Sequence, residues 1–164
     1  MTTTARSDEG PADPLALECQ VCFAVVLAAR SVVALYRPLL EPMGLTHPQY
    51  LVMLALWEHG TLSVKDLSRL LQLDPGTLSP LVKRLQAAGY VHRDRDPRDE
   101  RLLAIGLTDQ GRALRAQAEL IPAGIVERLG MDVAELTELH AALTRVIGAS
   151  RRALDDGAAA RTTD

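Results

Sequence analysis

The first part of the chain has an almost unbroken apolar pattern from Leu15 to Leu40. The polar interruptions are few, namely Glu18, Gln20, Arg30, Ser31 and Arg37. The apolar positions surround the axis of the predicted helix instead of forming one stripe, and such a helix needs burial on several sides. A chain of 164 residues offers little cover of its own, so the pattern predicts a partner subunit against this helix.

The centre of the chain contains three short helices with clear start signals. Each follows a residue whose side chain can accept a hydrogen bond from the first helical turn, and these capping residues are Thr46, Ser63 and Asp74. A tight turn joins the second and third helices, and the third, with Pro75 in its first turn, ends before Gly89. This arrangement predicts a helix-turn-helix, whose second helix normally enters the major groove of DNA.

The next segment changes to a strand pattern. Residues 90–93 and 102–107 are the predicted strands, and the polar loop 94–101 makes them a hairpin with a long charged tip. A hairpin directly after a helix-turn-helix predicts a winged helix-turn-helix. The competing interpretation is an all-α bundle with an incidental hairpin. The predicted fold class is therefore mainly α with a small β-hairpin wing.

The C-terminal third is predicted to be helical. Thr108 begins a long helix that Pro122 is expected to break or kink, and Asp132 begins a final helix that reaches about Leu154. Both ends of the chain, residues 1–14 and 155–164, are rich in small and polar residues. We expect these ends to be a disordered N-terminal arm and a loose C-terminal tail.

The charge of the chain is unevenly distributed. The net charge of −3 comes from acidic ends, whereas residues 61–108 hold eight Lys and Arg against six acids. Four arginines lie in the predicted hairpin, of which Arg93 is the first. The candidate DNA-binding side chains lie on the predicted recognition helix and the wing: Thr77, Ser79, Lys83, Arg84, Arg95, Arg98 and Arg101. Helix residues of these types can meet bases or phosphates, and arginine suits a narrow minor groove. Acidic residues alternate with the wing arginines, so an ordinary solvated loop is the competing interpretation.

The two cysteines, Cys19 and Cys22, form a CxxC motif within the predicted first helix. A thioredoxin-like site needs this motif at a helix N-terminus in a βαβ setting, and a zinc site needs more ligands at regular spacing. Neither pattern is found, so we expect no metal or cofactor, and the thiols alone would suit two buried structural residues. The N-terminus lacks a secretory signal, and the apolar run from Val21 to Ala29 is too short for a bilayer, which predicts a cytoplasmic protein.

Several blocks of the sequence resemble the MarR family of winged-helix regulators. They are the recognition-helix segment 76–85, the wing segment 96–101 and the helix start 107–111. Within the family, the chain is most similar to the OhrR-type organic hydroperoxide sensors, through residues 20–24, 35–40, 45–54 and 73–78. The resemblance implies a homodimeric transcriptional repressor, not an enzyme, that binds a pseudo-palindromic operator.

The resemblance also implies a domain organisation. Residues 15–154 would form a single MarR-like domain between the two loose ends. Within it, residues 15–45 and 109–154 would be the N- and C-terminal dimerisation helices, and residues 46–108 would be the winged helix-turn-helix.

In OhrR-type sensors, a cysteine of the first helix is oxidised and the repressor then releases its operator; Cys22 corresponds to that cysteine. Tyr36 corresponds to one of two tyrosines that hydrogen-bond the reactive thiolate, and His47 replaces the other, which changes how the thiolate is tuned. Because 14 residues of continuous helix rise about 21 Å, Tyr36 would contact Cys22 of the partner subunit. The wing acid and arginine of the family correspond to Asp99 and Arg101, where the acid orients the arginine in the minor groove.

The partner of oxidised Cys22 stays open. No cysteine follows Cys22, so the C-terminal resolving cysteine of some family members is absent, and a small cellular thiol is the expected trap for the sulfenate. Cys19 is the alternative, although a disulfide between two positions of one helix would be strained. Two other functions remain: a MarR-type repressor of small aromatic ligands with structural cysteines, and a thiol peroxidase, for which no further catalytic residues can be placed.

Overall fold

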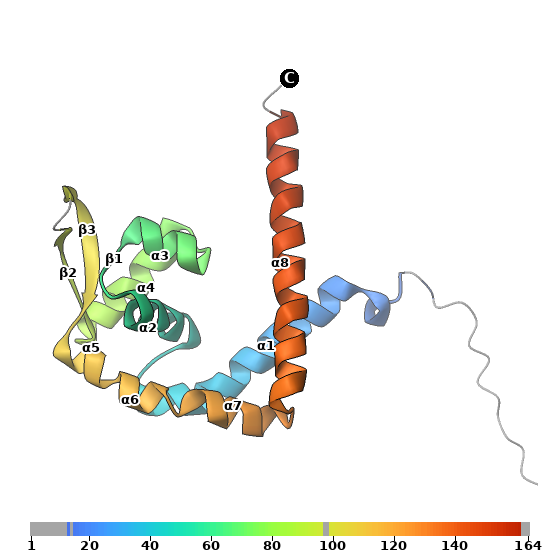
Figure 1. Cartoon of the computed structure of the whole chain (residues 1–164), viewed down its shortest axis with the longest axis horizontal. Coiled ribbons are helices and arrows are strands. Elements are labelled where there is room, and N and C mark those ends of the chain that lie inside the picture. The colour runs from blue at the N-terminus through green and yellow to red at the C-terminus, as the bar shows by residue number, and fades with distance from the viewer. Residues whose placement is uncertain (1–12, 14, 97–98, 162–164) are drawn as a thin grey trace, which may run out of the picture. The chain divides into compact units, whose positions relative to one another are not determined.

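The computed structural model describes residue 13 and the ranges 15–96 and 99–161. The chain divides into two compact units, Met1–Glu119 and Leu120–Asp164, and each is described by itself. Helices dominate both units, and the first unit also contains a small antiparallel sheet (Figure 1). The predicted fold class, mainly α with a β-hairpin wing, is confirmed.

The first unit begins with a short 3-10 helix η1, Leu17–Cys19, followed by the long helix α1, Val21–Leu40. Leu40 is the one residue of α1 that is buried, and large apolar side chains along the helix are exposed, including Phe23, Val26, Leu27 and Val33. Together with the turn up to Met43, this helix is long and apolar enough to cross a membrane. The expectation that the apolar run is too short is therefore wrong on length, although a helix buried in a soluble protein meets the same criteria.

Three helices with side-chain caps follow the 3-10 turn η2 (Glu41–Met43). They are α2 (His47–His59), α3 (Val64–Leu71) and α4 (Pro75–Ala87). The backbone N–H of Thr46 donates to the Gln49 side chain at 2.9 Å, and Ser63 Oγ accepts from the N–H of Asp66 at 3.1 Å. The predicted helix starts are confirmed. Fully buried leucines from these helices form much of the core, namely Leu56, Leu67, Leu78 and Leu85.

The sheet has three strands in the order β1-β3-β2, and every pairing is antiparallel. The wing consists of β2 (Val91–Asp96) and β3 (Asp99–Leu107), so the predicted hairpin is confirmed. The prediction that 94–101 is a long loop is wrong, because residues 94–96 and 99–101 extend the two paired strands. The short strand β1 (Leu62–Ser63) pairs with β3 between α2 and α3 and was not predicted. It joins the start of the helix-turn-helix to the wing.

Close backbone approaches tie the base of the wing to the neighbouring helices α5 (Asp109–Ala113) and α6 (Arg115–Ala118). A Cβ atom at Gly111 would overlap the carbonyl oxygen of Tyr90, so this crossing requires glycine. The indole N–H of Trp57 donates to the Gly111 carbonyl at 2.9 Å, and the Tyr90 hydroxyl donates to the Met43 carbonyl at 2.9 Å. The first bond joins α2 to α5, and the second joins the residue before β2 to the turn after α1.

The second unit contains α7 (Ile121–Leu129) and α8 (Val133–Arg161). Pro122 lies in the first turn of α7, so the long helix predicted from Asp109 is three shorter helices. Helix α8 continues past Leu154, and residues 155–161 are helical where the sequence predicts a loose tail. Its exposed large apolar side chains are Val133, Leu139, Leu143, Val146, Ile147 and Leu154.

Candidate functional site

Helix α4 has one buried face and one exposed face. Leu78, Leu81, Val82 and Leu85 are buried, and the side chains predicted to meet DNA are all exposed: Thr77, Ser79, Lys83 and Arg84. The helix-turn-helix fold therefore places these four predicted residues on the accessible side of one short helix. Hydroxyl, ammonium and guanidinium groups are the donors that bind phosphate oxygens and base edges.

The start of α4 is held by a compact cap. Asp74 accepts hydrogen bonds from the backbone N–H of Thr77 at 2.9 Å and from its hydroxyl at 2.6 Å. The hydroxyl of Thr77, followed by its backbone N–H, holds the pKa of the Asp74 carboxyl below its usual value. The Thr77 hydroxyl hydrogen is therefore engaged in the cap, and its oxygen lone pairs are what remains for a DNA contact.

The wing arginines do not all serve the same purpose. Arg93 is half-buried, and its guanidinium donates to the backbone carbonyl of Ser79 at 3.4 Å, so it connects the wing to α4. The structure describes only the backbone at the other predicted wing residues Arg95, Asp99 and Arg101, and Arg98 lies outside the described residues. A register shift between Arg95 and Asp96 bends the strand before the tip.

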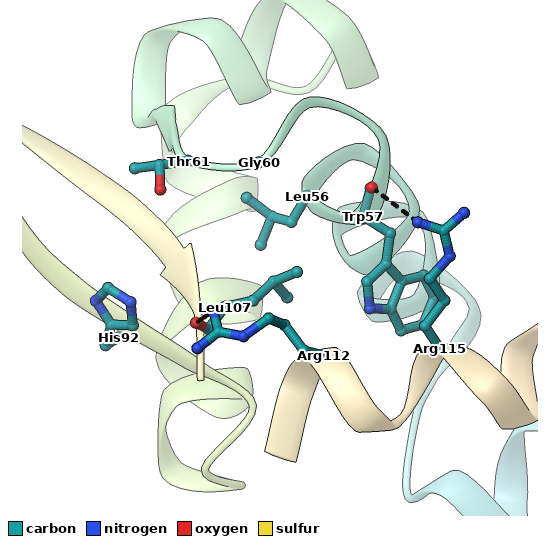
Figure 2. Close-up of a pocket in the computed structure, with 8 residues that line it drawn as sticks. All are labelled: Leu56, Trp57, Gly60, Thr61, His92, Leu107, Arg112 and Arg115. Atoms are coloured by element: carbon teal, nitrogen blue, oxygen red, sulfur yellow. Dashed lines mark hydrogen bonds between the residues drawn. The ribbon is translucent and has the colours of Figure 1, made fainter. Parts of the chain in front are cut away.

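A pocket of about 410 Å³ lies at the base of the wing (Figure 2). It is lined by Leu56, Trp57, Gly60, Thr61, His92, Leu107, Arg112 and Arg115. Arg112 donates to the carbonyl of Leu107 at 2.6 Å, and Arg115 donates to the carbonyl of Trp57 at 3.3 Å. Sequence reasoning missed this cationic pair because the two arginines follow the wing and carry no motif of their own. Apolar lining residues together with two guanidinium groups suit a small organic anion that has an apolar body.

The cysteines lie at a junction between helices. Cys19 is the last residue of η1 and Cys22 is the second residue of α1, with Gln20 between the two helices. Both thiols are free and exposed in the single chain. The prediction that the CxxC motif sits within one helix is therefore wrong, because the chain is extended at Gln20, with φ −86° and ψ 115°.

The predicted sensor-supporting residues Tyr36 and His47 lie together. Their ring centroids are 5.0 Å apart in an edge-on arrangement, and the Tyr50 ring lies 6.0 Å from Tyr36. Burial raises the pKa of Tyr36 and lowers the pKa of His47. At neutral pH, Tyr36 is therefore a protonated donor and His47 is an uncharged ring. Sequence reasoning missed Tyr50, whose aromatic character in a helix signals only a core position.

A second cavity, of about 630 Å³, opens beside this aromatic cluster. It lies between α1 and the start of α2, and its lining includes Arg30, Val33, Arg37, Leu45 and His47. The cavity combines apolar walls with cationic groups and a ring that can hydrogen-bond. An organic molecule with a polar end is the type of ligand that such walls accept.

Similar proteins identify the family. A model of the MarR family matches residues 45–103. The HTH-type transcriptional regulator TtmR of Methylorubrum extorquens is 48% identical over 132 residues, which are 80% of this chain and 68% of that protein. The organic hydroperoxide resistance transcriptional regulator of Bacillus subtilis is 40% identical over 135 residues, which are 82% of this chain and 92% of that protein. The chain belongs to the MarR family.

Solved structures agree with this assignment. Reduced AbfR bound to DNA superposes with a TM-score of 0.73 and 31% identity, covering 84% of this chain and 94% of that one. The protein is thus a winged-helix transcriptional regulator, and the family and its relatives are not enzymes. The exposed face of α4 and the wing are the elements that the sequence predicts to contact DNA.

Burial of the neutral His47 ring makes the stability of this MarR-family protein depend on pH. The unfolded chain takes up a proton near the ordinary pKa of 6.5, and the folded state resists it. The folded state therefore loses stability as the pH falls below that value. His47→Gln places an amide that does not titrate at this position. The melting temperature of this variant should therefore fall less than that of the wild type between about pH 7.5 and about pH 5.5. His140→Gln, an exposed histidine of α8, is the control, and an equal loss in His47→Gln and wild type would contradict the assignment.

Proposed function

We propose that this protein is a homodimeric repressor that releases its operator when an organic hydroperoxide oxidises Cys22. The observation that carries the proposal is the pair Tyr36 and His47, 5.0 Å apart beside the 630 Å³ cavity. Two polar rings beside an accessible cavity suit a thiolate that a small oxidant must reach. The 40% identity to a regulator named for organic hydroperoxide resistance supports the same function.

The sensor is assembled from two subunits in this proposal. Cys22 and Tyr36 lie on one continuous helix, and 14 residues of helix correspond to a rise of about 21 Å. One chain therefore cannot bring the two side chains together. A dimer that buries the exposed apolar side chains of α1 would place Cys22 of the partner subunit beside Tyr36. The exposed apolar residues of α8 supply a further dimerisation surface.

Oxidation then changes the dimer. The Cys22 thiolate attacks the peroxide, which gives a sulfenate and releases an alcohol. Apolar cavity walls such as Val33, Ala34 and Leu45 favour the alkyl part of an organic peroxide over hydrogen peroxide. The sulfenate does not fit the hydrogen bonds that held the thiolate, so the subunits shift. Such a shift moves the two recognition helices away from a half-site spacing of about 34 Å. The protein, which we propose to be cytoplasmic, then releases its operator DNA.

The cysteine assignment is tested with Cys22→Ser. The serine variant should bind operator DNA as tightly as the reduced wild type, because it differs only by a hydroxyl in place of the thiol. It should stay bound when cumene hydroperoxide is added, because it has no thiol to oxidise. Fluorescence anisotropy with labelled operator measures both properties. Cys19→Ser is the matched control and should still respond to the peroxide. Peroxide-induced release of the Cys22→Ser variant would refute the proposed sensor.

The wing assignment is tested with Arg101→Ala. Loss of a guanidinium from each minor-groove contact should weaken operator binding and reduce its salt dependence by about one ion per wing. Anisotropy titrations at several salt concentrations give both quantities. Arg128→Ala, on the exposed side of α7, is the control, and an unchanged salt slope in Arg101→Ala would argue against a DNA contact.

A second candidate function is a repressor that responds to small aromatic anions, with structural cysteines. The pocket at the wing base supports it, because Arg115 lies beside the indole of Trp57 and Arg112 lies beside Leu107 in the same lining (Figure 2). Salicylate should then raise the melting temperature of the wild type and release the operator, and Arg115→Gln should lose both effects. Arg145→Gln on α8 is the control. If salicylate changes neither melting nor DNA binding, the second candidate is rejected.

A further inference from the structure

The exposed start of α4 offers hydrogen-bond acceptors to whatever lies against it. We infer that Asp74 and Thr77 determine sequence specificity together, by accepting a hydrogen bond from the exocyclic amino group of a cytosine in the major groove. Proteins of the MarR family bind operator DNA, and the inference concerns the base that α4 selects. It does not depend on the proposed oxidation of Cys22.

The carboxylate of Asp74 fixes the direction of the Thr77 hydroxyl. The two groups lie 2.6 Å apart, from Thr77 Oγ1 to Asp74 Oδ2. An ionised carboxylate accepts hydrogen bonds and donates none, so the hydroxyl must be the donor of this bond. A hydroxyl has one hydrogen. The Thr77 oxygen can therefore accept a further hydrogen bond from DNA but cannot donate one.

The backbone donors at the start of α4 are also engaged. Pro75 has no N–H, and the N–H groups of Gly76 and Thr77 both stabilise the Asp74 carboxylate, the second at 2.9 Å. The N–H of Leu78 donates to the Asp74 carbonyl at 3.0 Å. Within residues 75–78, which the structure describes, no N–H therefore remains for a phosphate, although helix starts commonly bind anions. The carboxylate would also repel a phosphate.

A proline inside α4 adds one more acceptor at the same place. Pro80 cannot donate the helical hydrogen bond to the carbonyl of Gly76, four residues earlier. Asp74, Gly76 and Thr77 are all exposed. A Cβ atom at Gly76 would lie 2.9 Å from Asp74 Oδ1, so a larger residue there would displace the carboxylate. We call the Asp74 carboxylate, the Gly76 carbonyl and the Thr77 oxygen the acceptor cluster.

The major groove offers few partners for such a cluster. The first residues of a recognition helix contact base edges, and guanine and thymine present acceptors there, whereas cytosine N4 and adenine N6 are donors. In an A·T pair, the amino group lies between two acceptors, adenine N7 and thymine O4. In a C·G pair, it lies beside guanine O6 alone. A carboxylate meets less repulsion at the second pair, so cytosine is the expected base.

The substitution Asp74→Asn should reverse this preference. Asparagine has nearly the same shape, and its oxygen can still cap the N–H of Thr77. Its amide nitrogen takes the place of Oδ2 and donates to Thr77 Oγ1. The Thr77 hydroxyl then accepts that bond and turns its own hydrogen outward. The variant should therefore prefer thymine O4 where the wild type prefers cytosine N4, and loss of a helix cap alone would not exchange one base for the other.

The test begins with selection of binding sites from a randomised DNA library by the full-length, reduced wild type. We expect one position of each half-site to require cytosine. Fluorescence anisotropy then compares the selected operator with a version that has thymine at this position. The wild type should bind the thymine version at least about fivefold more weakly, as for other single mismatches, and Asp74→Asn should bind it at least as tightly as the cytosine version.

Two further variants separate the hydrogen bond from the fold. Asp132→Asn makes the same substitution at a residue that accepts a hydrogen bond from the first turn of α8, and it should discriminate as the wild type does. Thr77→Val should lose the preference for cytosine, whereas Thr77→Ser, which keeps the hydroxyl, should retain it. Thermal melting followed by circular dichroism confirms that each variant is folded.

The alternative results would overturn the inference. Asp74→Asn might bind both operators more weakly by the same factor, in which case Asp74 acts as a helix cap alone. A wild type that requires another base, or no base, at the positions altered in Asp74→Asn would contradict the reading of cytosine. A wild type that enriches no sequence would refute both this inference and the proposed repressor. The protein stays reduced throughout, so a failure of the peroxide sensor does not alter these results.

Discussion

The first helix cannot be buried by its own chain, and most of the molecule's behaviour follows from this constraint. Leu40, at the end of α1, is buried, whereas large apolar side chains from Val21 to Val33 are exposed. An exposed apolar surface of this extent marks an interface, and proteins of the MarR family act as dimers. In the proposed sensor, Cys22 lies at the start of this helix and Tyr36 lies near its end, where it contacts His47 of α2. Oxidation and subunit contact are therefore coupled.

The winged helix-turn-helix is connected to the end of α1 by hydrogen bonds and shared packing. The Tyr90 hydroxyl, beside the wing, binds the Met43 carbonyl in the turn after α1. Trp57, at the other end of α2 from His47, binds Gly111 at the wing base. Helix α2 therefore carries His47 at its start and, in its last turn, the Trp57 bond to α5. In the proposed sensor, these packed elements would carry a movement of α1 to the winged helix-turn-helix.

Sequence reasoning succeeded where local chemistry determines structure. Thr46, Ser63, Asp74 and Thr108 are capping residues in the sequence and in the structure, because a cap depends on neighbours a few residues away. It missed β1, since a strand of two residues shows no periodicity and exists through its pairing with β3. It also ended the last helix too early, because the run from Asp155 has an acidic pair and a glycine that are typical of a terminus.

Some residues of the candidate site could be predicted from the sequence and others could not. Cys22, Tyr36 and His47 were predicted because a family pattern marks them, and the structure brings Tyr36 and His47 together. The pair Arg112 and Arg115 was not predicted to line a pocket, because its pairs with Asp109 and Glu119 are ordinary contacts along a helical segment. The bond from Arg115 to the Trp57 carbonyl depends on tertiary structure. Backbone acceptors have no sequence signature, so sites built on them are visible only in coordinates.

The junction between Cys19 and Cys22 could not be predicted from the sequence, because no capping residue marks it. Within the described residues, no side chain caps the start of α1 at Gln20, so the sequence contains no signal that a helix begins there. The first turn keeps N–H groups without helical partners, and such groups stabilise negative charge. The missing side-chain cap therefore explains why the sequence pattern predicts one helix across the CxxC motif, where the structure has η1 and α1.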